Sequence, residues 1–246
     1  MRIFAKGGKR GFFTAFLVLV PLIVPAWEVP RWFIPLREAV FAQVLKADEV
    51  APLYRQASAQ ARDLLSGAEK NAMLSRCEYM MGRAFQQDER RDEALSCYEK
   101  GIALAEQSIA EEPSAAAYEI LAAHYGQICM LKPAPWVMSN GPKVEQYAKK
   151  ASALDSRNAG SKYLLASRWA FGPGILGDPK RGISEMTKIL SGGVFLQKDD
   201  YFNVYSAIGY AHLRLNQKQE ALVWIKKALE LYPTNKFALQ MRDEAE

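Results

Sequence analysis

The chain has 246 residues, with 32 basic and 27 acidic side chains and a formal net charge of +5. Residues 1–26 contain four of the positive charges and no negative one, which leaves a net charge of +1 for the remainder. Because the charges of that remainder alternate in sign along the chain, as in 88–100, and form no basic stripe with aromatic residues, the composition argues against nucleic-acid binding.

The first 26 residues have the layout of a secretory signal. Basic residues precede the uncharged apolar run 12–24, and Val24 and Ala26 suit the small-residue cleavage site. We therefore expect export, to the periplasm or to the outer face of the cytoplasmic membrane. Whether the segment is cleaved stays open, because residues 11–27 would form a membrane tether if it were retained.

Residues 27–46 are expected to form a linker, and residues 47–246 one continuous helical domain. No Gly/Ser-rich segment or shift in composition divides the longer part, and its apolar residues recur at helical spacing. The fold class is therefore predicted to be all-α. Apolar and small residues near the start of this part predict a capping helix or half repeat over about 47–68.

The stretch 202–235 has the spacing of a two-helix repeat. Gly209 and Ala221 allow two antiparallel helices to approach each other, and Ile225 fills the groove beside them. Pro233 ends the second helix. This pattern of small and large residues resembles the tetratricopeptide repeat, in which 34 residues form one helix pair.

Such a unit cannot bury its apolar face alone, so neighbouring units are expected to stack against it. Three less regular units precede it, the second with an insertion at 131–143 and the third with a turn at 172–179. The resemblance implies a right-handed superhelical solenoid of about four helix pairs plus the N-terminal capping helix. The units cover about 75–113, 115–157, 159–195 and 202–235.

No catalytic site and no cofactor is predicted. Gly172, Gly174 and Gly177 match a dinucleotide-binding fingerprint, but the residues before them have a helical pattern instead of the required strand. Asp178 followed by Pro179 is typical of a helix start. The glycines are therefore interpreted as a connector between two helices.

No metal site is predicted either. His124 and His212 each lie inside a repeat helix, without a ligand partner one turn away. Cys77, Cys97 and Cys129 have no metal-binding spacing and are expected to be buried free thiols, with a Cys77–Cys97 disulfide left open. We therefore expect a binding protein and not an enzyme.

The resemblance also implies where a partner would bind. In this repeat family, positions 2, 5, 9, 12 and 13 of each first helix line a concave groove, where aromatic rings beside arginine and amide groups suit a peptide segment or a helix of another protein. About half of these side chains are expected to pack against neighbouring helices instead, and a homo-oligomer is a further alternative. The predicted partner-binding residues are Arg76, Tyr79, Arg83, Glu119, Gln127, Tyr163, Ser167, Phe171, Asn203, Tyr210 and Arg214, with Trp136 of the insertion as an extra contact.

A narrower resemblance rests on three segments, 111–131, 147–171 and 176–186. In this order they resemble the exported helical T-component of bacterial tripartite solute transporters, with Gly182 where alanine is usual. The resemblance implies a periplasmic component whose partner is a solute-binding or transport protein. It also implies an alternative function, in which the chain carries a small hydrophobic ligand within a transporter assembly.

Overall fold

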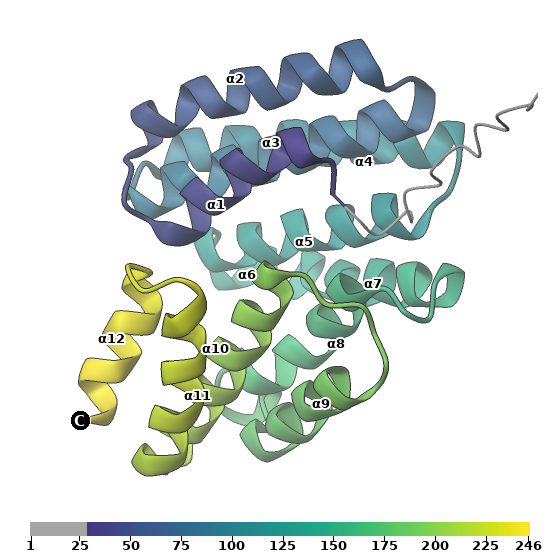
Figure 1. The fold of residues 1–246 in the computed structure, drawn as a ribbon. Helices are drawn as coiled ribbons and strands as arrows, with labels where there is room; N and C mark the ends of the chain where they lie inside the picture. The colour runs from purple at the N-terminus through teal and green to yellow at the C-terminus, as the bar shows by residue number, and fades with distance from the viewer. Residues whose placement is uncertain (1–28) are drawn as a thin grey trace, which may run out of the picture.

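The computed structural model describes residues 29–246, and these residues form helices and no strand (Figure 1). The all-α prediction is therefore confirmed. The expected export signal at 1–26 lies outside the described residues. Within the described part of the chain, no helix is both long enough and apolar enough to cross a membrane.

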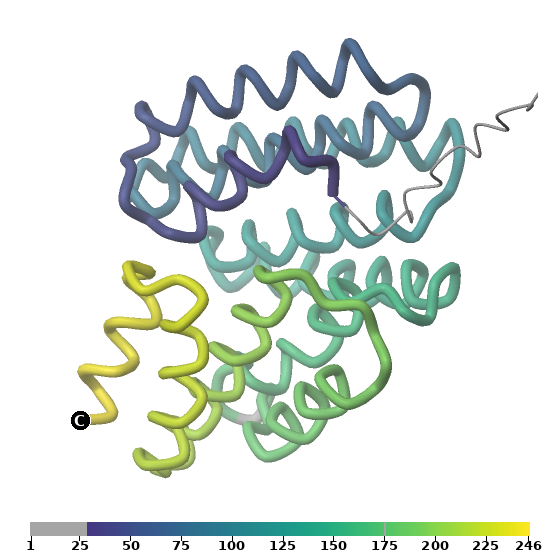
Figure 2. The backbone as a smooth tube through the Cα atoms, in the orientation of Figure 1, coloured from purple at the N-terminus to yellow at the C-terminus, as the bar shows by residue number. Residues whose placement is uncertain are grey.

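The described helices follow one another through short connections, as the backbone in Figure 2 shows. Their bounds are η1 (Arg31–Phe33), α1 (Ile34–Ala42), α2 (Ala47–Leu64), α3 (Gly67–Gln87), α4 (Arg91–Glu111), α5 (Ala115–Leu131), α6 (Ala134–Asn140), α7 (Pro142–Leu154), α8 (Ala159–Phe171), η2 (Gly174–Leu176), α9 (Pro179–Ser191), α10 (Lys198–Arg214), α11 (Lys218–Leu231) and α12 (Lys236–Ala245).

Several helix starts are fixed by a polar side chain. Ser114, Asn158, Asp178 and Asn235 each accept a hydrogen bond from the backbone N–H three residues later, which satisfies a donor that the helix itself leaves free. Asp178 is followed by Pro179 at the first helical position, so the predicted helix start is confirmed. The glycines before it belong to the connector between α8 and α9.

The helices pack in pairs, α3 with α4, α5 with α7, α8 with α9 and α10 with α11. A Cβ atom at Gly209 would lie 2.8 Å from Cγ1 of Ile225, so a side chain there would push α10 and α11 apart. A Cβ atom at Gly182 would lie 2.7 Å from the backbone nitrogen of Ala170, which has the same consequence for α8 and α9. Stacked on one another, these close pairs form an all-α helical-repeat solenoid.

Some parts of the solenoid depart from a regular pair. Helices α3 and α4 each have 21 residues, so the first pair extends from Gly67 to Glu111 and ends just before Pro113. The insertion at 131–143 contains α6 and leads into α7. Helix α12 packs on α11 as an additional helix at the C-terminal end.

The segment 27–46, expected to be a linker, instead contains η1 and α1, and this corrects the prediction. Phe33, Leu36, Val40 and Phe41 of this segment are almost fully buried. Their spacing places them on one helix face, which explains why the segment folds onto the rest of the protein. Residues that we interpreted as a connection are therefore part of the main hydrophobic core.

Helix α1 joins the two ends of the solenoid. It packs on α2 and α3, and its C-terminal end meets the turn between α11 and α12. The carbonyl groups of Phe41 and Ala42 lie in the last turn of α1, where a helix has no partner for them. They accept hydrogen bonds from Nδ2 of Asn235 at 2.8 Å and from Oγ1 of Thr234 at 2.6 Å.

Aromatic and charged contacts extend this junction. The Phe41 ring lies 5.7 Å from the Phe202 ring and 5.3 Å from the Tyr232 ring, measured between centroids. Glu38 accepts a hydrogen bond from the Tyr232 hydroxyl at 2.9 Å and forms an ion pair with Lys198. Residues 194 positions apart in the sequence are thereby in contact, and the solenoid closes on itself.

This junction predicts that one substitution in α1 strongly reduces the free energy of unfolding. Phe41→Ala should reduce the free energy of unfolding by about 3–5 kcal/mol, because the ring is 1% exposed and its removal leaves a cavity. Val44→Ala is the control, since Val44 is 67% exposed and its loss should change stability by less than about 0.5 kcal/mol. Urea unfolding of both variants measures the difference, and equal stabilities would contradict the role given to α1.

Candidate functional site

The first helices of the four pairs, α3, α5, α8 and α10, carry the predicted partner-binding residues on the concave side of the solenoid, except Trp136, which lies on α6. Part of this side is covered by α1. The guanidinium carbon of Arg83 lies 4.6 Å from the centroid of the Phe41 ring, and Nε2 of Gln87 donates to the Val40 carbonyl at 3.1 Å. Arg83 therefore contacts the N-terminal helix of its own chain instead of an open groove.

Arg76 and Glu119 form an ion pair between α3 and α5. Nη2 of Arg76 lies 2.7 Å from Oε2 of Glu119, and both side chains are largely buried. The Glu119 carboxylate is the main reason why the pKa of Arg76 is raised, and the carboxylates of Asp199 and Asp200 add to the effect. These two predicted binding residues therefore hold two helices together.

Tyr79 and Gln127 also bind each other. Nε2 of Gln127 donates to the Tyr79 hydroxyl at 3.1 Å. The Tyr79 ring packs edge-on against His124 at 5.5 Å and lies 6.1 Å from the Tyr98 ring, measured between centroids. Both predicted residues thus fill the space between α3, α4 and α5.

Other members of the predicted set are packed as well. Burial raises the pKa of the Tyr163 hydroxyl, and Oγ of Ser167 donates to the carbonyl three residues earlier at 2.9 Å. The Trp136 ring stacks on Tyr125 at 6.4 Å, so the insertion packs against α5. Asn203 is half-buried. Several of the predicted residues therefore stabilise the fold, as the alternative interpretation expected.

The structure brings Phe171, Tyr210 and Arg214 together at one end of the concave side. The rings of Phe171 and Tyr210 stack at 5.0 Å, and Phe237 of α12 follows at 6.2 Å from Tyr210. Phe171 is 36% exposed and Phe237 is 39% exposed. Nη1 of Arg214 donates to the Ala170 carbonyl at 2.8 Å beside them. We call Phe171, Tyr210 and Phe237 the aromatic ladder.

The sequence did not predict a charged cluster where α1 meets α10. Nη1 of Arg37 lies 3.0 Å from Oδ1 of Asp199, and the same guanidinium donates to Gln197. The pKa of Asp200 is raised to about 7, mainly by burial and secondly by the neighbouring Asp199 carboxylate. Both acids lie in the first turn of α10, where acidic residues are common, so their positions in the sequence do not indicate this contact.

We also did not predict from the sequence a groove that lies between α7, α8 and α9. It is lined by Lys162, Leu165 and Trp169 of α8 and by Arg181 and other residues of α9. The signal was present in the sequence, because residues spaced by three and four positions share one face of a helix. The predicted binding positions lie on the concave face of each first helix, and this face of α8 is not among them.

Cys77, Cys97 and His124 are buried, whereas Cys129, also expected to be buried, is a half-buried free thiol. Cys77 and Cys97 are buried free thiols, and burial raises the pKa of each to about 12, so both stay protonated at neutral pH. His124 is fully buried, and burial lowers its pKa to about 3. In residues 29–246, no three His, Cys, Asp or Glu side chains gather in an arrangement that could hold a metal ion.

The chain is similar to known helical-repeat proteins. Two family models, both described as tetratricopeptide repeat, match residues 79–108 and 202–235. The solved structure of TTC0263, a thermophilic TPR protein in Thermus thermophilus, is 17% identical with a TM-score of 0.55, and the match covers 87% of this chain and 98% of that one. YrrB, described as a TPR protein with an unusual peptide-binding site, is 14% identical with a TM-score of 0.38, over 84% and 88% of the two chains. No protein of curated function is similar enough to count as a match.

The burial of His124 predicts how stability depends on pH. The folded protein keeps this imidazole neutral, whereas the unfolded chain binds a proton at a pKa of about 6.5. The contribution of neutral His124 to the free energy of unfolding is therefore complete above about pH 6.5, the unfolded-state pKa. It decreases as the pH falls toward the folded-state pKa, by at most about 1.4 kcal/mol per pH unit.

Urea unfolding at about pH 7 and about pH 5.5 tests this for the wild type, His124→Gln and the control His212→Gln. We expect the wild type and the control to lose stability more steeply than His124→Gln. Since the wild type and His124→Gln share every other titrating group, including Asp200, the difference between their slopes isolates His124. Identical slopes would show that His124 does not resist protonation.

Proposed function

The chain is a tetratricopeptide-repeat protein, and we propose that it is an exported scaffold that binds a segment of a partner protein. The aromatic ladder is the observation that carries this proposal. Three rings from α8, α10 and α12 form a continuous row, of which the two outer rings are exposed. Exposed aromatic rings beside an arginine are typical anchors of protein interfaces.

The ladder suits a peptide or a helix because it is open on one side and crosses several helices. Phe171 and Phe237 offer apolar area, and the Tyr210 hydroxyl offers a polar group between them. Arg214 is held beside Phe171 by its hydrogen bond to the Ala170 carbonyl. An extended segment lying across the row would bury aromatic surface that now faces water.

The interior of the closed solenoid is less suited to the alternative function, the carriage of a small hydrophobic ligand. Two ion pairs lie there, one between Arg76 and Glu119 and one between Arg37 and Asp199. An apolar molecule next to these groups would desolvate their charges without replacing the hydrogen bonds to water that are lost. Protein binding is therefore the function that we propose.

The proposal places the scaffold in the periplasm or on the outer face of the cytoplasmic membrane. It rests on the basic and apolar pattern of residues 1–26, and residues 11–27 would be a tether if that segment is retained. The likeness of 111–131, 147–171 and 176–186 to a transporter component suggests a solute-binding or transport protein as the partner. The proposal includes no catalytic role.

The ladder is tested by cross-linking and mass spectrometry of the tagged full chain in its native cell envelope. Phe171→Ala with Phe237→Ala should cost about 2 kcal/mol or more of binding free energy and so abolish recovery of the partner. Tyr201→Ala with Val223→Ala is the control, since both side chains are exposed but lie outside the ladder. Equal recovery by both double variants, or self-links alone, would refute the proposal.

Export is tested separately by cell fractionation. The full chain should be found in the periplasm or at the membrane, and a chain without residues 1–26 should stay in the cytoplasm. Sequencing the N-terminus of the exported protein distinguishes a cleaved signal from a retained tether. Equal distribution of both chains would show that residues 1–26 do not direct export.

A further inference from the structure

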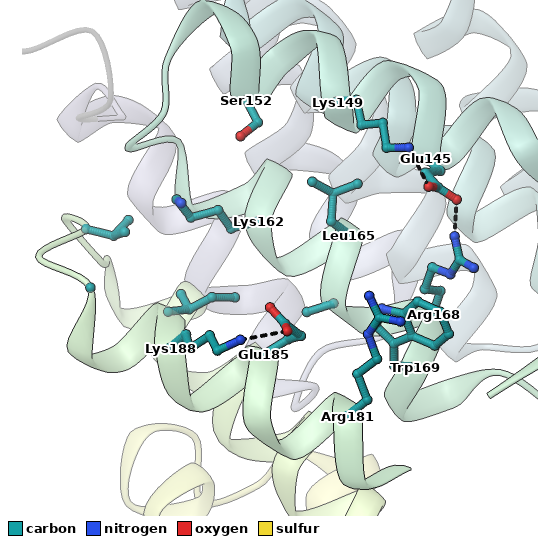
Figure 3. A pocket seen from close by; sticks show the side chains of 14 residues that line it. Glu145, Lys149, Ser152, Lys162, Leu165, Arg168, Trp169, Arg181, Glu185 and Lys188 are labelled. Carbon is teal, nitrogen blue, oxygen red and sulfur yellow. Dashed lines mark hydrogen bonds and ion pairs between the residues drawn. The ribbon is translucent and has the colours of Figure 1, made fainter. Parts of the chain in front are cut away.

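A groove lies between α7, α8 and α9 (Figure 3). Its volume is about 490 Å³, which lies within the range of about 300–1,000 Å³ that is usual for ligand sites. Basic side chains surround it, with Lys149 on α7, Lys162 and Arg168 on α8, and Arg181 and Lys188 on α9. Among the described residues that line it, the acidic ones are Glu145 and Glu185.

The close contact of α8 and α9 builds one wall of this groove. Gly182 lies against the backbone of Ala170, so the two helices approach more closely than a side chain would allow. This places the guanidinium carbon of Arg181 3.8 Å from the centroid of the Trp169 ring, and that of Arg168 lies 4.1 Å away. Contact with the ring holds each guanidinium in place while the N–H groups at its edge can still donate, as Arg168 does to Glu145.

The positive charge of the groove is only partly neutralised. Glu145 pairs with Lys149 at 2.7 Å and also with Arg168, and these contacts keep the pKa of Glu145 below its usual range. Glu185 pairs with Lys188 at 2.9 Å. Within residues 29–246, Lys162 and Arg181 form no ion pair.

The floor of the groove is apolar. It is made by Leu165 and Ala166 of α8 and Ile189 of α9, with Val194 beyond the end of α9. Ala166 and Ile189 are each 4% exposed, so the floor belongs to the core that joins the third and fourth helix pairs. A ligand that fits must combine negative charge for the rim with apolar groups for the floor.

We propose that this groove binds an acidic peptide segment of a partner protein, with its carboxylates on Lys162 and Arg181 and its apolar side chains on the floor. The site is independent of the aromatic ladder and lies on the opposite side of α8. Arginine stacked on an aromatic ring presents two parallel N–H donors to a carboxylate. A nucleic acid fits less well, because its sugar–phosphate backbone has no apolar side chains to place on the floor.

The test is the binding of a fluorescein-labelled peptide with the repeated unit Glu-Glu-Leu, measured by fluorescence anisotropy with the full chain. A Gln-Gln-Leu peptide and a single-stranded oligonucleotide are the comparison probes. The groove variant is Lys162→Gln with Arg181→Gln. The matched control is Lys218→Gln with Lys226→Gln, which makes the same change in net charge at two exposed positions of α11.

The wild type and the control should bind the acidic peptide alike, and the groove variant at least about tenfold more weakly. Equal weakening in both variants would show general attraction between charges and overturn the proposal. No binding by the wild type, or stronger groove-dependent binding of the oligonucleotide, would also overturn it.

A second measurement does not depend on how well the variants fold. A carbodiimide cross-link joins a bound glutamate to a lysine in contact with it, and mass spectrometry locates that lysine. Links to Lys162, Lys149 or Lys188 support the groove, and links confined to lysines elsewhere refute it.

Discussion

The docking of α1 at both ends of the solenoid is the constraint on which the rest of the structure depends. A helix end leaves carbonyl groups without partners, and the last two of α1 are satisfied by Asn235 and Thr234. Burial of the Phe41 ring against Phe202 and Tyr232 adds apolar contact at the same place. Because these contacts join residues 194 positions apart, the shape of the whole solenoid is fixed by a short N-terminal helix.

Closure changes the role of the concave side. Once the ends meet, charged side chains on this side are partly removed from water, and an unpaired charge there would be costly. Arg76 with Glu119 and Arg37 with Asp199 are the resulting pairs. Several side chains that would recognise a ligand in an open solenoid therefore hold helices together in this one. The proposed recognition is left to the exposed aromatic ladder at one end of this side and to the groove between α7, α8 and α9.

The repeats could be predicted from the sequence because their contacts are local. Gly209 and Ile225 belong to one helix pair. The small residue and the large residue that this contact requires therefore lie close together in the sequence, where the pattern can be recognised. Helix α1 could not be found in this way. If Val50 is placed at position 20 of a repeat, the small-residue positions 7 and 8 fall on Arg37 and Glu38. Both are large and charged, so the repeat pattern does not indicate a helix there.

The candidate site was harder to predict, because exposure depends on how strongly the solenoid curves. Arg83 and Tyr210 both occupy position 9 of their repeats, yet Arg83 contacts the Phe41 ring of α1 while Tyr210 belongs to the aromatic ladder. No local pattern distinguishes them, since the difference arises from distant helices. Only the positions could be assigned from sequence, and not their exposure.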